Sequence, residues 1–537
     1  MAGGIFLKKA LKILGVALSL ILFLTAAPDA EAKKKTSSEK ILYIPHDNRP
    51  ISDEQTVAVV EKAGYKIIVP PKEILGSRDD LGNPDRLWEW LERNVKSDVR
   101  AAVVSSDALL YGSLVASRKH NYDRQIILER AELFKEFRAR HKKLPLYVFS
   151  SVMRTPRTGI ASGYGEPDYY RNYGANIFRY TALRDKFELE GLTQRETKEI
   201  NFLRKLIPAR AFDDWSRRRE KNFAANEKLI DLAKENVFTC LLLGRDDNAP
   251  FSQTHMEGRK LAAYGAGIDK SKYLTLAGID EIGLMLLTRA INDYTQIVPL
   301  VFVEYNSGTG GETIPTYSDE SLDTSINAEL LAVGARRVEF ADAANFVLAV
   351  NTNLEGSTRE ANQPTNTTRP RAGTDIFANL VESYVNYGLK VAVADVAYTN
   401  GADNALMEQL KNRDLLFKLH AYAGWNTATN STGFALSEGI LALKTSDRDR
   451  RRLLLTRYLD DWAYQSNIRQ AVATRLNWLK GDGFYESLDR KKYSAADWSS
   501  QLMIDFLHKN LPEVGIITRL HVEFPWNRMF EARINLH

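Results

Sequence analysis

Apolar segments of this chain end repeatedly in acidic or amide residues, and amphipathic helical segments lie between them. The apolar segment 238–243 runs into Asp246 and Asp247, and the segment 273–277 runs into Asp280. Strand and helix patterns that alternate at this spacing are typical of parallel βαβ units. In such folds, ligands and catalytic groups lie at the carboxyl ends of the strands. The pattern therefore predicts one site that is assembled from several strand ends.

The number of candidate strands predicts the fold class. We expect an α/β fold: a TIM-like (β/α)8 barrel with an inserted small α/β unit and a helical C-terminal region. An open doubly wound sheet is the alternative. With the inserted unit set apart, the candidate barrel strands are 41–45, 66–69, 101–105, 146–150, 238–243, 273–277, 390–395 and 416–422.

The order of these patterns divides the chain into parts. The predicted parts are a signal peptide at 1–32, the first six βα units of the barrel at 33–297 with an insertion at 151–235, an inserted α/β unit at 298–355, the last two βα units at 356–434 and a helical region at 435–537.

The first residues have the three features of a secretory signal. Lys8, Lys9 and Lys12 precede the apolar segment 13–27, and a small residue, Ala32, ends an Ala-Glu-Ala cleavage sequence. An uncleaved anchor is the alternative, but an apolar segment of about 15 residues is short for a membrane span. We expect cleavage near Ala32, no stable membrane span afterwards, and a secreted protein, extracellular or periplasmic.

Charge and cysteine content exclude other classes of protein. The 73 basic and 68 acidic residues give a net charge of +5 and are spread along the 537-residue chain, so nucleic-acid binding is not expected. Cys240 is the only cysteine, so an intrachain disulfide is impossible, and its apolar neighbours predict a buried side chain. No oligomeric state is indicated.

Two pairs of adjacent carboxylates are the candidate catalytic groups: Asp246 with Asp247, and Asp280 with Glu281. In such a pair, one carboxyl is pushed toward its protonated form while the other stays ionised, which suits a general acid with a charged partner. Both pairs also stand where a helix or turn begins, where capping and the helix dipole alone favour acidic residues. We rank Asp246–Asp247 first and Asp280–Glu281 second.

Other polar and aromatic residues at strand ends are predicted to hold the substrate. Carboxylates, amides and arginine form directional hydrogen bonds with sugar hydroxyls or anionic groups, and tryptophan offers a stacking face. Arg49 could instead tie down its own loop, and Trp425 could be a core aromatic. The predicted binding residues are Asp47, Arg49, Asp107, Arg154, Asp395, Asn400, Asp403, Trp425 and Asn426.

Motifs for other chemistries are missing from the sequence. It has no Gly-x-Ser-x-Gly elbow, no phosphate loop ending in Gly-Lys-Ser/Thr and no His-Glu-x-x-His zinc motif. We therefore expect no cofactor and no metal. An all-oxygen cation site formed by Asp47, Asp107 and Asp246 is the alternative.

Several long motifs resemble the bacterial domain-of-unknown-function family 4127 (DUF4127), from Ile41 to the end of the chain. This resemblance implies one family unit and no settled activity. The motifs are Asp-Asn-Arg-Pro at 47–50, Ser-Ser-Asp-Ala-Leu-Leu-Tyr-Gly-Ser-Leu-Val-Ala-Ser-Arg at 105–118, Gly-Arg-Asp-Asp-Asn-Ala-Pro at 244–250, Ala-Gly-Ile-Asp-Glu-Ile-Gly at 277–283, Asn-Gly-Ala-Asp-Asn-Ala-Leu-Met at 400–407, Tyr-Ala-Gly-Trp-Asn-Thr-Ala at 422–428 and Phe-Pro-Trp-Asn-Arg at 524–528.

A shorter likeness concerns mechanism. A strand ending in Asp-Asp resembles the paired aspartates of glycoside hydrolase family 84, which implies that Asp246 polarises a 2-acetamido group and Asp247 is the acid. The pair follows the fifth candidate strand here, which departs from that family's placement.

Together these features predict a secreted glycoside hydrolase with a carbohydrate substrate, bacterial or host glycan, and N-acetylhexosamine-containing glycans are the first expectation. One alternative is a non-catalytic exported protein that binds glycan or cell-wall polymer. The other alternative is a metal-dependent hydrolase.

Overall fold

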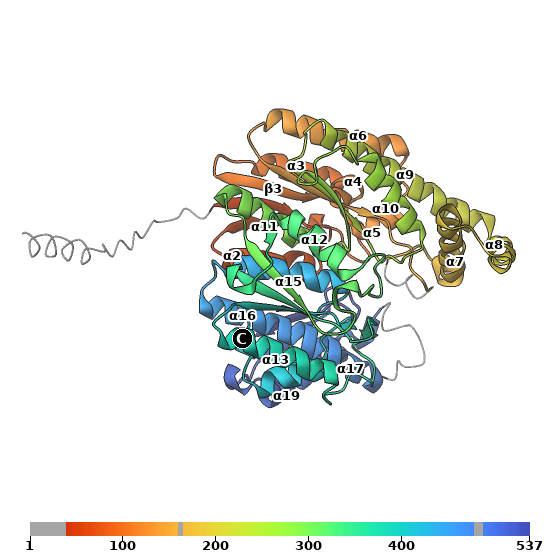
Figure 1. Ribbon diagram of the computed structural model, residues 1–537. Coiled ribbons are helices and arrows are strands. Elements are labelled where there is room, and N and C mark those ends of the chain that lie inside the picture. The colour runs from red at the N-terminus through yellow and green to blue at the C-terminus, as the bar shows by residue number, and fades with distance from the viewer. Residues whose placement is uncertain (1–38, 159–164, 477–486, 537) are drawn as a thin grey trace, which may run out of the picture. The chain divides into compact units, whose positions relative to one another are not determined.

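The computed structural model describes residues 39–158, 165–476 and 487–536 (Figure 1). The signal peptide predicted at 1–32 lies outside these residues. No helix in the described part of the chain is long and apolar enough to cross a membrane.

The first half of the chain forms a six-stranded parallel sheet. Its strand order is β2-β1-β3-β4-β5-β6, so the chain runs outward from β1 in both directions. The strands are β1 (Lys40–Ile44), β2 (Lys66–Ile68), β3 (Val99–Ser105), β4 (Leu146–Val152), β5 (Cys240–Arg245) and β6 (Tyr273–Ala277). All six correspond to segments that the sequence predicts as strands.

A second parallel sheet has five strands in the order β13-β11-β9-β7-β8. Its strands are β7 (Leu300–Tyr305), β8 (Arg336–Arg337), β9 (Phe346–Asn351), β11 (Val391–Asp395) and β13 (Ala421–Ala423). In this sheet, β9 pairs with β7 on one side and with β11 on the other. The strands predicted as a separate inserted unit at 298–355 thus share one sheet with the strands predicted to complete the barrel at 356–434.

The α/β class with parallel sheets is confirmed, but the closed eight-stranded barrel is not. Among the described residues, no ladder joins β6 to β7, and the chain between them forms α11 (Ile282–Thr295). Nearly every turn of α11 is buried, because it packs on β3 and β4 of the first sheet and on the helices that cover the second sheet. A strand count along the sequence cannot reveal which strands pair, and here the pairing produces two sheets.

Helices cover both faces of each sheet, which gives five layers. Alternate side chains of a strand point to opposite faces: Leu42 and Ile44 of β1 enter one core, whereas Ile41 and Tyr43 enter another. The outer face of the first sheet packs against α3 (Pro84–Asn94), α4 (Ser106–Tyr111), α6 (Arg124–Arg140) and α9 (Ala209–Lys234). Other helices beside this sheet are α5 (Leu114–Lys119) and α10 (Gln253–Tyr264).

The middle layer of helices belongs to both sheets. Apolar side chains of α2 (Thr56–Lys62), α11, α12 (Leu322–Val333) and α15 (Ala428–Ala442) share one core with the facing strands. The outer face of the second sheet packs against α13 (Ala372–Asn386), α14 (Asn404–Asn412), α16 (Asp447–Arg457), a π-helical segment Tyr458–Ile468, α17 (Arg469–Arg475) and α19 (Lys492–Asn510). This continuous packing holds the two sheets together.

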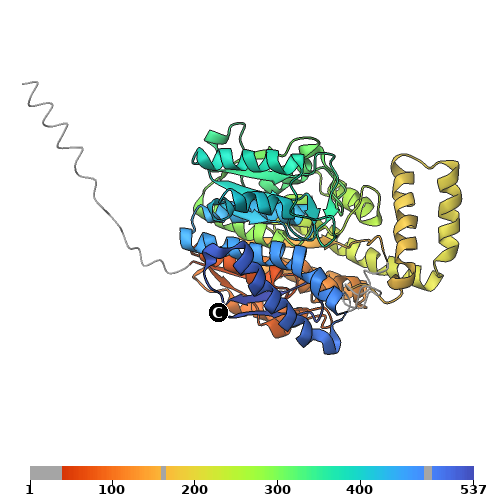
Figure 2. The same cartoon turned by 90° about the horizontal axis from the view of Figure 1, so that it is seen from below.

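Two smaller features complete the fold. The predicted insertion at 151–235 contains α7 (Tyr170–Leu189) and α8 (Gln194–Leu206), a helical pair that stands beside the sheets in Figure 2. The C-terminal region is helical until the hairpin of β14 (Leu520–Glu523) and β15 (Arg533–Leu536). Cys240 is buried, and burial raises the pKa of its thiol to about 12.

Candidate functional site

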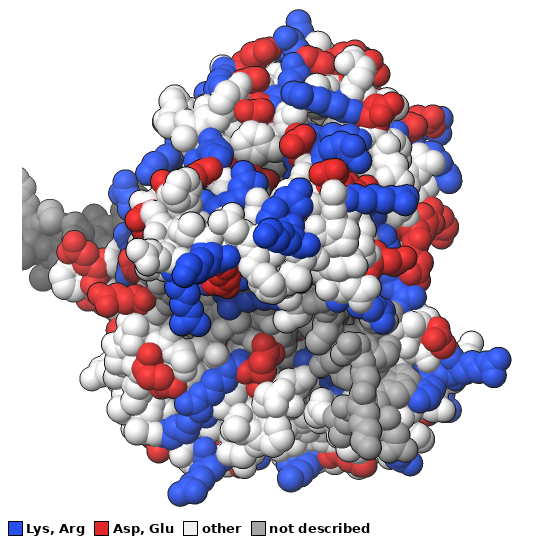
Figure 3. Space-filling view, turned by 90° about the vertical axis from the view of Figure 1, so that its right-hand side faces the viewer, with Lys and Arg blue, Asp and Glu red and all other residues white. Residues whose placement is uncertain are grey.

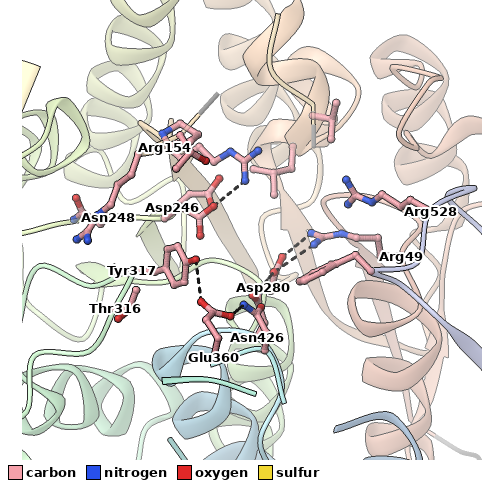
Figure 4. A pocket seen from close by; sticks show the side chains of 18 of the residues that line it. Arg49, Arg154, Asp246, Asn248, Asp280, Thr316, Tyr317, Glu360, Asn426 and Arg528 are labelled. Atoms are coloured by element: carbon pink, nitrogen blue, oxygen red, sulfur yellow. Dashed lines mark hydrogen bonds and ion pairs between the residues drawn. The ribbon is translucent and has the colours of Figure 1, made fainter. Parts of the chain in front are cut away.

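A cavity of about 560 Å³ lies where the carboxyl ends of both sheets meet (Figure 4). Its size falls in the range of small-ligand sites, roughly 300–1,000 Å³. Segments that follow strands of both sheets and the β14–β15 turn line it. Because all strands within each sheet are parallel, their following loops gather at one edge. The sequence-predicted residues that line the cavity are Asp47, Arg49, Arg154, Asp246, Asp247, Asp280, Asn400 and Asn426.

One wall of the cavity is built around the buried side chain of Arg49. Its Nη2 donates to Asp280 Oδ1 at 2.6 Å, and its Nε donates to Asp47 Oδ2 at 2.8 Å. Burial acts to raise the pKa of Asp280, but the charge of Arg49 and a contact with His46 hold it well below its usual range. Asn426 Nδ2 also donates to Asp280 Oδ2 at 3.2 Å, so this carboxylate joins the ends of β6 and β13.

A second wall carries the adjacent aspartates that follow β5. Arg118 Nη2 donates to Asp246, and Arg154 Nη1 donates to Asp247 Oδ2 at 2.7 Å. The side chain of Asp247 remains 28% exposed. Burial and the neighbouring charge of Asp246 raise the pKa of Asp247, and the two arginines oppose that shift.

A carboxylate that the sequence analysis missed, Glu360, lies in the short strand β10 (Arg359–Glu360), which follows β9 and pairs with β12 (Tyr398–Thr399). Its Oε1 accepts a long hydrogen bond from Tyr317 Oη at 3.4 Å, and its Oε2 accepts from Asn400 Nδ2 at 2.9 Å. The backbone carbonyl of Tyr317 in turn accepts from Asn248 N at 3.1 Å. Tyr317 therefore connects Glu360 with the loop that carries Asp247, and burial and the charges of both carboxylates raise its pKa.

Four cavity residues have left-handed backbone conformations. The φ angles are 33° at Asp247, 68° at Tyr317 and 60° at both Asn400 and Asn426. Non-glycine residues adopt such angles at a cost and are concentrated at functional sites. The strain supports the assignment of this cavity as the site.

Two predicted site residues have their side chains bound elsewhere. The carboxylate of Glu281 points into the middle helix layer, where Oε2 accepts from Asn430 of α15 and burial raises its pKa to about 8. Asp107 accepts hydrogen bonds from Ser151 N and Oγ, both at 2.8 Å. Neither residue lines the cavity, so their side chains contact protein instead of a ligand.

Three more predicted binding residues lie beneath the second sheet's loops. Asp395 accepts from Tyr422 Oη at 2.9 Å, and Asp403 caps the N-terminus of α14 and pairs with Arg371. Trp425 is 2% exposed and packs on Phe530, as the core interpretation expects. These three side chains do not line the cavity.

The C-terminal region supplies cavity residues that strand ends could not indicate. Trp526 and Arg528 belong to the Phe-Pro-Trp-Asn-Arg motif, and Phe530 follows it. Trp526 Nε1 donates to Asn48 Oδ1 at 2.7 Å, which fixes this turn against the loop after β1. Arg469, the first residue of α17, completes this side of the cavity.

In residues 39–158, 165–476 and 487–536, no group of three or more His, Cys, Asp or Glu side chains is arranged to hold a metal ion. Of the alternative cation ligands, Asp47 binds Arg49, Asp107 binds Ser151, and Asp246 binds Arg118.

Comparison with protein families gives one match. A family described as "Protein of unknown function (DUF4127)" matches residues 41–535, which include all but the first residue of the two large sheets and every residue that lines the cavity. No curated protein and no solved structure matches the chain.

Proposed function

Because the chain belongs to the DUF4127 family, whose description gives no activity, we propose a function from the cavity itself: hydrolysis of a glycosidic bond. The substrate is a bacterial or host glycan, and glycans that contain N-acetylhexosamine are the first to test. The observation that carries this proposal is the pair of carboxylates, Asp247 and Glu360, that Tyr317 connects across one cavity.

In the proposed reaction, Asp247 is the general acid. It is the partly exposed member of its pair, and burial and the charge of Asp246 favour its protonated form. Asp247 would donate its proton to the oxygen of the leaving sugar as the glycosidic bond breaks. This division between a protonated and an ionised carboxylate is the one that glycosidases use.

Glu360 is the opposing carboxylate. No ion pair binds it within the described residues, and the hydrogen bonds from Tyr317 and Asn400 orient it. It would remove a proton from the attacking water, or attack the sugar itself and form an ester that water then cleaves. Either route returns one proton to Asp247 or Glu360 and consumes one water molecule.

The rest of the cavity suits a sugar ring. The amide of Asn426 and the carboxylate of Asp280 offer hydrogen-bonding groups, whereas Trp526 and Phe530 offer apolar faces. Asp280 is bound by Arg49, which suits a positioning role better than the acid role predicted for it. Glu281 is not proposed as catalytic, because its side chain lies outside the cavity.

The test uses purified chain 33–537, chromogenic glycosides and cell-wall fragments. We expect turnover of at least one substrate, and a fall of roughly 100-fold or more in kcat for both Asp247→Asn and Glu360→Gln. Glu355→Gln is the matched control, because this partly exposed carboxylate pairs with Arg359 outside the cavity. Unchanged kcat in both cavity variants would overturn the assignment.

Non-catalytic glycan binding is the second candidate. It is favoured by the arginine partners of Asp246, Asp247 and Asp280, which hold carboxylates as hydrogen-bond acceptors. Glycan binding by the wild type with no turnover in the same screen would support it.

Export is also proposed, from the signal sequence alone. The mass of protein collected from the culture medium or periplasm should correspond to a chain that begins near Lys33. A full-length chain found only in the cytoplasm would contradict export.

A further inference from the structure

We propose that the glycan bound in this cavity carries an anionic substituent, a carboxylate or a phosphate, and that Arg469 binds it. This inference rests on the proposed function only in taking the cavity as a sugar site. It adds a substrate class, acidic sugars, and a residue that selects for it.

The first observation is the environment of Arg469. The residue is 2% exposed and lines the cavity, yet its Nε and Nη1 are buried without a hydrogen-bond partner. Among the described residues, no carboxylate lies within ion-pair distance of it. A buried guanidinium without a partner is costly, so its place in a ligand cavity indicates that the ligand supplies the missing acceptor.

The second observation is that the neighbouring arginines are already neutralised. Arg49 binds Asp47 and Asp280, and Arg528 binds Glu531, with Arg528 Nε donating to Oε2 at 2.6 Å. Arg469 is therefore the source of the unbalanced positive charge on this side of the cavity. Its guanidinium carbon lies 5.3 Å from the centre of the Phe530 ring, which fixes its plane.

The backbone supports this placement. Arg469 directly follows the π-helical segment Tyr458–Ile468, and π-helical turns are frequent at functional sites.

In Figure 4, Arg528 points into the cavity from the same side as Arg49. Figure 3 shows acidic and basic side chains interspersed on one face of the molecule.

The chemistry of the guanidinium defines the ligand class. Its planar fork forms paired hydrogen bonds with carboxylate and phosphate oxygens. A neutral sugar offers no charge to balance Arg469, whereas a sugar acid or sugar phosphate does. Both kinds of anion share this chemistry, and the experiment separates them.

The experiment measures Kd by calorimetry for three probes: glucuronate, glucose 6-phosphate and glucose. Chain 33–537 should bind at least one anionic probe 10-fold or more tightly than glucose. The anion that binds more tightly identifies the substituent as carboxylate or phosphate. Arg469→Met should abolish this preference by weakening the binding of the anionic probe far more than the binding of glucose. Arg475→Gln, an exposed arginine on the same helix, should keep the wild-type preference.

A second measurement detects the unpaired charge without any ligand. Arg469→Met should have a higher Tm than the wild type, because methionine fills the space and removes a buried charge. The anionic probe should raise the Tm of the wild type and not that of the variant. A variant that unfolds at a lower Tm and keeps the anion preference would overturn the proposal.

Other results overturn it as well: equal affinity for glucose and both anions, or no binding of either anion. None of these probes contains a bond to hydrolyse, so the result is independent of turnover. Arg469-dependent anion binding without turnover would leave this inference standing and refute hydrolysis. Turnover of neutral glycans without anion preference would do the reverse.

Discussion

Replacing Arg49 with methionine tests how the loops after β1 and β6 are held. The change introduces an apolar side chain of similar length. It removes a guanidinium that lies 2.6 Å from Asp280 Oδ1 and 2.8 Å from Asp47 Oδ2. The variant leaves two buried carboxylates without their cation. We expect the free energy of unfolding to fall at pH 7, and the cavity to lose affinity for any ligand.

The magnitude follows from burial and distance. Arg49 is 7% exposed and Asp280 6%, so solvent screens the pair weakly. Two unit charges about 4 Å apart interact by about 4 kcal/mol at an effective dielectric constant near 20. Removing one partner of a buried pair costs about 3–5 kcal/mol in measured cases. The expected loss is therefore about 3–5 kcal/mol.

The pH dependence has a definite sign. In the wild type the pKa of Asp280 is depressed, so its stabilising contribution is present above the unfolded pKa of about 3.9 and is lost as pH falls through the lower folded value. In Arg49→Met this contribution is absent, and burial instead raises the pKa of Asp280. The stability deficit of the variant should be largest at pH 7 and should shrink as pH falls toward 5.

The assay is urea denaturation followed by tryptophan fluorescence at pH 7, 6 and 5. Arg100→Met is the matched control, because its pair with Glu39 is partly exposed to solvent and should contribute little. The double variant Arg49→Met/Asp280→Asn should recover part of the loss. A deficit below about 1 kcal/mol at pH 7, or one that grows toward pH 5, would refute a buried and stabilising Arg49–Asp280 pair.

Three further changes probe the core and the cavity. Glu281→Gln should flatten the pH dependence of the free energy of unfolding. The folded pKa of Glu281, about 8, exceeds the unfolded value, so wild-type stability falls as pH rises from about 4.5 to 8. An unchanged slope in denaturation measured across this pH range would refute this. Leu242→Ala, at a fully buried position in β5, should cost about 2–5 kcal/mol in denaturant unfolding, and a loss under 1 kcal/mol would mean a loosely packed sheet. Asn426→Ala should unfold at a lower Tm than Asn426→Gly. Both variants lose the hydrogen bond to Asp280, but only alanine is strained at a φ of 60°. The reverse order of Tm values would contradict the backbone geometry.

The strands were largely predictable from the sequence, and their pairing was not. The predicted strand 273–277 coincides with β6, because an apolar run between turn residues has few alternatives. The predicted strand 416–422 was longer than β13, since 416–418 forms a 3-10 turn. The pairing of strands depends on long-range packing, including that of the apolar helix α11. Local patterns along the sequence do not encode this packing.

The site was predictable where side chains follow a strand directly. Asp246 and Asp247 come straight after β5 and reach the cavity. Asp395 fails the same rule, because it is the last residue of β11 and its carboxylate bonds within the sheet's end. Glu360 ends the two-residue strand β10, which the sequence does not predict as a strand, and Arg469 is the first residue of a helix. Neither residue stands at a strand end of the predicted barrel. Only the fold brings these two residues to the cavity.

The most direct test of the central claim is a crystal structure of Asp247→Asn with a bound acidic glycan fragment. The account predicts a sugar ring between Asn at position 247 and Glu360, with its anionic group on the guanidinium of Arg469. A fragment that binds in solution but lies outside this cavity in the crystal would contradict both the proposed site and the substrate class.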